Sequence, residues 1–305
     1  MQRAIVELRY GPEGGTKKVL SPGETLRVGR KAKAQWIVSD KHMSGVHFEV
    51  AYDGAKVLVR DLSKGTGTLV GGQKIAAAEE LVHGGWIRAG ETDFMVYLEA
   101  ATPPDEDEMD VLLAAEPDEL EPLEAQWVEE NRARLLGDKR RRAARAAEAL
   151  SLLRAVEGPL YVVLDAARTD RILTVVRESV DRYRSLYEGF DGEALEDVAP
   201  YLVEIDRSSS LLARLVEEGW GNRWGIFIVY PRSFKELRRH LRRFLMVADA
   251  ETRKKYYFRF YDPVVLREFL PTCTPKQKAE LFGEIRAFLV EDPFGHVARF
   301  PAEVS

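Results

Sequence analysis

The sequence predicts a multidomain protein, with an N-terminal all-β sandwich over residues 1–100 and a C-terminal α/β domain with a helical lobe over residues 158–305. The first hundred residues consist of short alternating apolar runs separated by Gly, Pro and Asp-Gly signals, a pattern typical of a sandwich. After Pro159, apolar runs of strand length alternate with amphipathic helical patterns, which indicates an α/β layer. A flexible linker over residues 101–122 and a linker helix over residues 123–157 join the two parts.

Charge is distributed unevenly along the chain. The 305 residues carry a net charge of −5, yet residues 101–130 contain 12 acidic residues and no Lys or Arg. Like-charge repulsion and low hydrophobicity predict a mobile tether there, and the remainder is too evenly charged for a nucleic-acid binder. No apolar run approaches the ~18 residues needed to span a bilayer. Cys273 is the one cysteine, which excludes a disulfide within the chain and favours a cytoplasmic setting.

A spaced set of loop residues lies inside the predicted sandwich. It runs from Gly29-Arg30 through Ser44 and His47 in SGVH to the segment DLSKGTGTLVGG. This order and spacing resemble the forkhead-associated (FHA) domain over essentially all of residues 1–100. The resemblance implies an eleven-stranded sandwich whose loops at one end bind phosphothreonine peptides.

The same resemblance implies roles for individual residues. Arg30 and Ser44 would hold the phosphate, since a guanidinium fork and a hydroxyl suit a dianion, while Gly29 and His47 would shape the loops. The remaining residues placed at this phosphopeptide site are Lys41, His42 and Thr66. Thr66 and Gly71 stand where the family has asparagines that grip the peptide. Two interpretations remain open: a phosphothreonine site that requires Arg30, or a sandwich kept for docking without phosphate recognition.

The C-terminal half predicts the following strands and helices. Strands are expected at Leu160–Ala167, Ala199–Asp206, Gly225–Tyr230 and Tyr256–Tyr261, and helices at Asp170–Tyr187, Ser208–Glu218, Ser233–Val247, Pro263–Leu270 and Thr274–Ile285. Asp262-Pro263 is a capped helix start, because Asp caps a helix and Pro suits its first position.

A catalytic set is hard to find in these elements. His240 and His296 have no partners at metal-ligand spacing, and the chain has no phosphate loop or nucleophile elbow; we therefore expect no catalytic residue, no metal and no cofactor. Asp165 ends a strand, where α/β enzymes place functional acids, and Asp206 and Asp262 could converge with it. A turn or cap role for Asp165 is the alternative.

Basic residues gather on the helix that begins after Ser233. We place a partner-binding face there, formed by Arg238, Arg239, Arg242 and Arg243. A solvated face and a nucleic-acid contact are the other two interpretations. For the basic run 139–142 we favour a solvated helix face over nucleic-acid binding, because no aromatic stacking set accompanies the run.

Several motifs between Leu160 and Pro293 resemble a family of bacterial type VI secretion adaptors. They are LYVVLDAAR, APYLVEID, WGIFIVYPRSFKELRRHLRRFL and FRFYDPVVLREFL, the last containing the motif residues Arg259, Tyr261, Asp262 and Pro263. Members of that family are chaperones that bind a toxic effector and load it onto the VgrG spike. The resemblance implies no enzymatic activity, and we expect the four motif residues to hold a strand-to-helix corner.

These features together predict a cytoplasmic, non-enzymatic adaptor. Its α/β half would bind a type VI effector and the VgrG spike, and its FHA-like half a second partner, which could carry phosphothreonine. One alternative is a phosphothreonine-dependent signalling scaffold that loads no effector. Another is a hydrolase or transferase that uses Asp165.

Overall fold

The computed structural model describes residues 2–10, 14–116, 118–187, 195–206, 209–248 and 254–302. The chain forms two compact units, each described here by itself. One comprises Met1–Thr102 and Thr174–Arg184, and the other comprises Pro103–Leu173 and Ser185–Ser305. No helix in the described part of the chain has both the length and the apolar character that crossing a bilayer requires.

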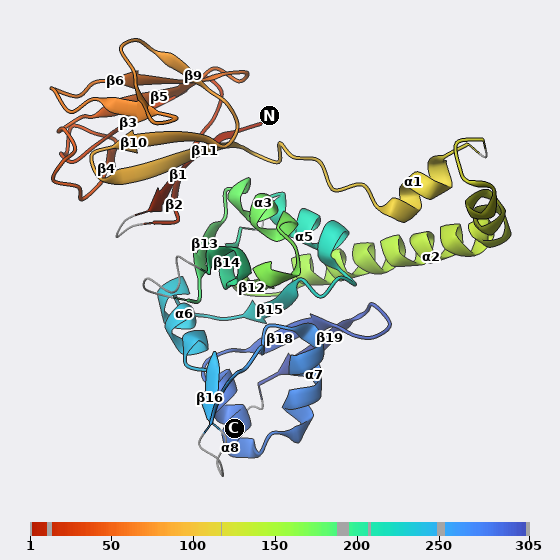
Figure 1. Ribbon diagram of the computed structural model, residues 1–305. Coiled ribbons are helices and arrows are strands. Elements are labelled where there is room, and N and C mark those ends of the chain that lie inside the picture. The colour runs from red at the N-terminus through yellow and green to blue at the C-terminus, as the bar shows by residue number, and fades with distance from the viewer. Residues whose placement is uncertain are drawn as a thin grey trace. The chain divides into compact units, whose positions relative to one another are not determined.

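The first unit is built on a sandwich of two sheets, visible at the red and orange end of the chain (Figure 1). One sheet has the strand order β2-β1-β11-β10-β7-β8 and the other β4-β3-β5-β6-β9. The strands are β1 (Ala4–Tyr10), β2 (Thr16–Leu20), β3 (Glu24–Gly29), β4 (Trp36–Ile37), β5 (Phe48–Tyr52), β6 (Val57–Asp61), β7 (Thr68–Val70), β8 (Gln73–Lys74), β9 (Glu79–Leu81), β10 (Gly85–Ala89) and β11 (Thr92–Leu98). The predicted sandwich is confirmed, with eleven strands described.

Alternating side chains of the two sheets form the core of the sandwich. In β5, Phe48, Val50 and Tyr52 are buried while the residues between them are half-buried, the two-residue period expected of a strand with one inner face. Phe48 and Phe94 meet edge to face with ring centroids 5.1 Å apart, a favourable arrangement for aromatic pairs. This packing fixes the strand ends from which the loops of the candidate site emerge.

The second unit contains a mixed set of helices around a sheet in which β14, β12, β15, β18 and β19 lie in that order; most of β13 and the second half of α3 fall in the segment Thr174–Arg184 of the first unit. The strands are β12 (Leu160–Asp165), β13 (Arg182–Ser185), β14 (Pro200–Ile205), β15 (Gly225–Val229), β16 (Met246–Ala248), β17 (Lys255–Tyr257), β18 (Ala287–Glu291) and β19 (Val297–Pro301). The helices are α1 (Glu108–Ala114), α2 (Pro122–Ala155), η1 (Ala166–Arg168), α3 (Arg171–Arg177), η2 (Glu196–Val198), α5 (Leu211–Gly219), α6 (Phe234–Arg242), α7 (Pro263–Thr272) and α8 (Pro275–Phe282). The predicted α/β domain with a helical lobe is confirmed.

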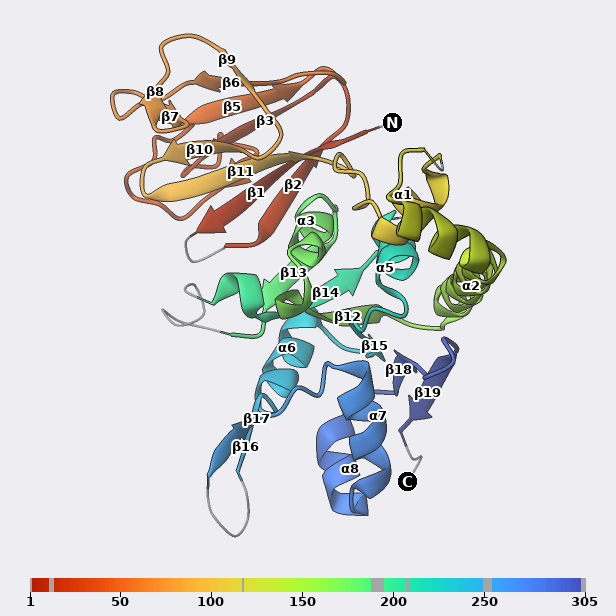
Figure 2. The same ribbon diagram turned by 45° about the vertical axis from the view of Figure 1, so that its right-hand side comes forward.

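One face of this sheet packs against the helical lobe of α6, α7 and α8 (Figure 2). Tyr161 and Val163 of β12 share a core with Phe234 and Leu237 of α6 and Leu266 of α7. Residues between them, such as Val162, point to the opposite face and are also buried, so β12 is covered on both sides as its continuous apolar run predicts. β12 runs antiparallel to both of its neighbours.

Two predicted elements are wrong, and the helix expected over Ser233–Val247 is too long, since α6 ends at Arg242 and Met246–Ala248 forms β16. The helix expected over Asp170–Tyr187 ends at Arg177 and is followed by β13, because the carbonyls of Val176 and Ser179 accept hydrogen bonds from Lys17 Nζ of β2 instead of continuing the helix. This is a tertiary contact that periodicity along the chain cannot reveal.

The buried aromatic strand at Tyr256–Tyr261 is the second error. β17 covers Lys255–Tyr257 only, and all three residues are exposed. Phe258 and Phe260 reach the core from the irregular segment that follows. The helix expected after Asp262-Pro263 begins as predicted, with Asp262 as its N-cap. Residue Ser208 of the helix expected to start there lies outside the described residues.

Candidate functional site

Three loops of the sandwich are tied together at Ser44, which lies in the loop between β4 and β5. The backbone N–H of Arg30, directly after β3, donates to the carbonyl of Ser44 at 3.1 Å. The backbone N–H of Lys64, after β6, donates to Ser44 Oγ at 3.2 Å. Because this hydroxyl oxygen accepts one bond from the protein, its proton remains available to donate to a ligand.

His47 is buried beneath these loops, which we call the loop cluster, and hydrogen-bonds two of them. Its ring is fully buried, and Nδ1 accepts a hydrogen bond from the backbone N–H of Ser44 at 2.9 Å. The proton is therefore on Nε2, which donates to the carbonyl of Gly67 at 3.0 Å. His47 thus joins the Ser44 loop to the loop that carries Thr66.

Gly29 allows two of these loops to approach closely. A Cβ atom at this position would meet the carbonyl oxygen of Gly45 and lie 2.8 Å from Val46 Cα. Both obstacles are backbone atoms, which have no rotamer with which to move away. Glycine is therefore required at Gly29 by packing and not by an unusual backbone angle.

The surface of the loop cluster is basic. The exposed cations with no hydrogen bond or ion pair from their side chains to any described residue are Arg30, Lys31, Lys33, Lys41 and Lys64. His42 differs, since its Nε2 lies 3.2 Å from Glu91 Oε1. A free guanidinium, several free ammonium groups and a hydroxyl donor can together receive a phosphate dianion.

Thr66 and Gly71 limit what the cluster can grip. Thr66 is exposed in the loop after β6, and its side chain makes no hydrogen bond to a described residue. Gly71 is likewise exposed, with a positive φ of 54°. Neither offers a side-chain amide, so peptide-backbone contacts of the family kind are absent at these two positions. Phosphopeptide binding by Arg30 and Ser44 stays a prediction.

In the second unit, two buried aspartates converge with three arginines. The side chains of Asp165 and Asp262 are 1% and 3% exposed, and Arg168 pairs with both, at 3.4 Å from Nε to Asp165 Oδ2. Arg259 also pairs with Asp165, and Arg223 with Asp262. We call these five residues the aspartate–arginine cluster.

The charged neighbours of Asp262 keep its carboxylate ionised. Burial alone would raise the pKa of Asp262, but hydrogen bonds from Arg223 and the Val264 N–H, with the charge of Arg168, hold it below its usual value. Both oxygens of Asp262 accept bonds, since Oδ1 also receives the Val264 N–H at 2.9 Å. A general base needs a lone pair that faces the substrate, and these oxygens are used inside the protein.

Asp206 does not join these acids. Because β12 and β14 are antiparallel, Asp165 lies opposite Pro200, whereas Ile205, the residue before Asp206, lies opposite Leu160. Asp206 is therefore at the other end of β12, and the expected convergence of three acids is wrong. The sequence reasoning missed Arg168 and Arg223; the LDAAR motif contained the first, but nothing in the sequence points to the second.

The strand-to-helix corner contains the expected motif residues. Asp262 caps α7 and Pro263 occupies its first turn, while Arg259 binds Asp165 across the sheet end. Tyr261 is buried, and burial, the neighbouring Tyr187 and Asp165 raise the pKa of its phenol. The segment between β17 and α7 is irregular and not a strand, and a structural role for the four motif residues stays a prediction.

The four arginines of helix α6 and its C-cap differ in their contacts: two donate to backbone carbonyls and two are exposed. Arg238 Nε donates to the carbonyl of Ser185 at 2.8 Å, and Arg242 Nε donates to that of Leu186 at 2.9 Å. Arg243 is exposed and contacts His240 Nδ1 at 2.6 Å. Arg239 is exposed and makes no hydrogen bond or ion pair to the described residues. The expected binding face is therefore reduced to Arg239 and Arg243.

Comparison with known proteins assigns both parts of the chain. Residues 26–90 match the model of the FHA domain, and residues 160–280 match a domain of unknown function, DUF4123. The FHA domain of the CT664 protein from Chlamydia trachomatis is 26% identical, with 31% of this chain and 96% of that chain covered and a TM-score of 0.30. The FhaA FHA domain complexed with the intracellular domain of Rv3910 is 28% identical, with 30% and 98% covered and a TM-score of 0.28. No curated protein matched.

The family matches thus assign an FHA domain to residues 26–90 and a domain of the DUF4123 family, the type VI effector-loading adaptors, to residues 160–280, which confirms both resemblances of the sequence motifs.

Proposed function

We propose that this chain is a cytoplasmic, non-enzymatic adaptor of a bacterial type VI secretion system. The DUF4123 domain would bind a toxic effector and help to load it onto the VgrG spike, and the FHA domain would dock a phosphothreonine-bearing protein. The observation that carries the proposal is the presence of both interaction domains in one chain. Joining two binding sites on one polypeptide raises the effective concentration of one partner near the other.

The loop cluster supports the phosphothreonine half of the proposal. Arg30 has a guanidinium without a partner among the described residues, and Ser44, in the adjoining loop, has a hydroxyl proton to donate. A doubly charged phosphate bound there would gain charge-assisted hydrogen bonds of about twice the usual strength. With no asparagine at Thr66 or Gly71, affinity would depend on the phosphate more than on the peptide backbone.

The aspartate–arginine cluster supports a role without catalysis. Asp165, the residue on which a hydrolase or transferase would depend, is 1% exposed and ion-paired to Arg168 and Arg259. Buried charges of this kind fasten neighbouring elements when they are fully paired. We assign Arg259, Tyr261 and Asp262 to holding the corner before α7.

The exposed arginines of α6 supply a candidate effector-binding face. Arg239 and Arg243 remain at the surface, whereas Arg238 and Arg242 bind backbone carbonyls. Changing Arg239 and Arg243 to Glu should abolish effector pull-down and leave the thermal unfolding temperature unchanged. Effector captured as well by this variant as by the wild type would move the binding face elsewhere.

Titration with phosphothreonine peptides tests the FHA half. The full chain should bind a phosphothreonine peptide library and ignore the unphosphorylated peptides, and Arg30→Ala should reduce affinity at least ten-fold. Arg60→Ala is the matched control, because Arg60 is an exposed sandwich arginine that pairs with Glu49 at 2.8 Å. Binding that does not depend on phosphate, or that survives Arg30→Ala, would refute the assignment.

A further inference from the structure

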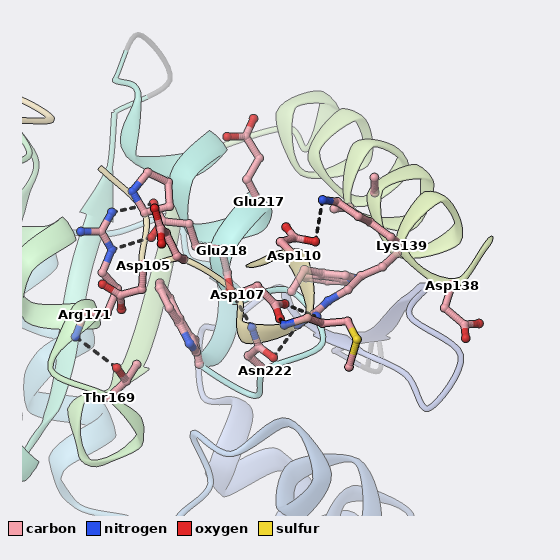
Figure 3. A pocket seen from close by; sticks show the side chains of 18 of the residues that line it. Asp105, Asp107, Asp110, Asp138, Lys139, Thr169, Arg171, Glu217, Glu218 and Asn222 are labelled. Atoms are coloured by element: carbon pink, nitrogen blue, oxygen red, sulfur yellow. Dashed lines mark hydrogen bonds and ion pairs between the residues drawn. The ribbon is translucent and has the colours of Figure 1, made fainter. Parts of the chain in front are cut away.

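A hollow of about 900 Å³ lies in the second unit, beside the long helix α2 (Figure 3). Its walls come from α1, α2 and α5 and from the turn after α5. The residues that line it include Asp107, Asp110, Lys139, Arg142, Trp220 and Trp224. A hollow of this size exceeds what ordinary packing leaves between helices, so it has room for further side chains.

Two buried tryptophans, Trp220 and Trp224, are among the residues that line the hollow, and we call them its floor. Trp220 and Trp224 are 6% and 8% exposed. Trp220 Nε1 donates to the carbonyl of Gly295 at 2.8 Å, which satisfies its one polar group. The Trp224 ring lies so close to Gly219 that a Cβ there would be 2.7 Å from it. Two fixed indoles form a preorganised surface for apolar side chains.

One wall of the hollow is basic and already meets acids of the same chain. Lys139 Nζ lies 2.6 Å from Asp110 Oδ1, as Figure 3 shows, and Arg142 Nη1 lies 4.0 Å from Asp107 Oδ2. All four side chains are between 44% and 57% exposed. Exposed ion pairs contribute only ~0–1 kcal/mol each, so these contacts hold α1 weakly.

The α1 segment places both acidic and apolar side chains at the hollow. Its acids Asp107 and Asp110 face the cations of α2, and Met109 and Leu113 line the hollow four residues apart, which is the spacing of one helical face. The helix has seven residues, too few to be stable by itself in water. Val111 remains 49% exposed, so α1 buries only part of its apolar side chains.

We propose that this groove binds an acidic, amphipathic helix of a partner protein, and that α1 is a weak internal occupant which the partner displaces. The cations of α2 would pair with the acids of the partner, and the indoles of the floor would receive its apolar face. The proposal depends on the adaptor function in one respect only: it takes the partner helix to be an acidic, amphipathic segment of the effector. A longer helix would gain more apolar contact than the seven residues of α1 and would therefore outcompete it.

The test uses the full chain and a fluorescein-labelled peptide of residues 103–116, PPDEDEMDVLLAAE. Asp107→Lys combined with Asp110→Lys should release the internal α1, since it reverses both ion pairs and removes the α1 cap that Asp107 provides. Fluorescence anisotropy should report at least ten-fold tighter peptide binding by this double variant than by the wild type. Binding should weaken as salt rises, because the pairs are solvent-exposed.

Two further variants, made in the same double-variant background, locate the binding surface. Lys139→Glu should reduce peptide affinity at least ten-fold, whereas Arg140→Glu, the same charge change at an exposed α2 residue outside the hollow, should leave it within two-fold. No binding by the double variant, equal binding by double variant and wild type, or equal losses from Lys139→Glu and Arg140→Glu would overturn the proposal.

The peptide assay tests the groove, and the effector pull-down tests the adaptor function, so each can give a negative result without the other. Effector captured by a chain that does not bind the peptide would reject the groove and retain the adaptor function. Peptide binding without effector capture would retain the groove and reject the adaptor function.

Discussion

Replacing Asp262 should reveal how strongly the aspartate–arginine cluster holds the DUF4123 domain together. Asp262 caps α7, and losing a helix cap costs about 1 kcal/mol. It also neutralises Arg168 and Arg223, whose side chains are 28% and 41% exposed. Breaking a fully buried pair costs about 3–5 kcal/mol, and the exposure of these arginines reduces that to about 1–2 kcal/mol. We therefore expect Asp262→Ala to lower the free energy of unfolding by about 2–3 kcal/mol.

Asp262→Asn separates the two contributions. Asparagine caps helices about as well as aspartate, so this variant should lose only the charge term of about 1–2 kcal/mol. Asp107→Ala is the matched control for the cap, because Asp107 caps the exposed α1 and its carboxylate is 4.0 Å from the nearest arginine nitrogen. It should cost no more than about 1 kcal/mol.

Urea unfolding followed by tryptophan fluorescence measures these differences, since Trp220 and Trp224 are both buried in the same unit. The pKa of Asp262 is lowered from 3.8. Its ionisation therefore stabilises the fold above pH 3.8, and this contribution is lost as the pH falls further. The gap between wild type and Asp262→Asn should be constant from pH 7 to pH 5. An Asp262→Asn variant as stable as the wild type at pH 7 would refute the reasoning.

The remaining predictions concern the first unit. Burial lowers the pKa of Lys17 from 10.5 to about 8. Between these two pH values the unfolded chain binds more protons than the folded chain. The free energy of unfolding should therefore rise with pH across this window, by at most about 3 kcal/mol. Lys17→Met should flatten that rise and Lys18→Met, at an exposed neighbour, should not; an equal rise in both would contradict the assignment. Gly29→Ala should destabilise the sandwich by 1–3 kcal/mol, an overpacking cost of about the usual size, as measured by urea unfolding. Gly137→Ala is the control from the second unit, in the interior of α2, where only the Arg141 side chain lies near the added Cβ. It should raise the free energy of unfolding by about 0.5–1 kcal/mol. Changes of the same sign for Gly29→Ala and Gly137→Ala would disprove the packing argument.

Local patterns predicted the elements that depend on local chemistry. The strands β12, β14 and β15 follow from continuous apolar runs, and the starts of α6, α7 and α8 follow from Ser233, Asp262 and Thr274. In each case the cap side chain accepts a backbone N–H of its own helix, so the signal lies within four residues of the structure it determines.

Features that depend on distant contacts could not be predicted in this way. The end of α3 depends on Lys17, more than 150 residues earlier in the chain, and the convergence of Asp165 with Asp262 depends on guanidinium groups from three separate segments of the chain. Arg223 adopts a positive φ of 57°, which no residue preference predicts for arginine. The loop cluster was predictable because a spaced motif carries it, whereas the groove beside α2 has no motif.

The most direct test of the central claim is affinity purification of the tagged chain from its native cell, with and without phosphatase treatment, followed by identification of the bound proteins. The proposal predicts a type VI effector in both samples, and a second protein that is lost after phosphatase treatment and from the Arg30→Ala chain. Purification of the chain without an effector, or with an effector that phosphatase or Arg30→Ala releases, would contradict the account.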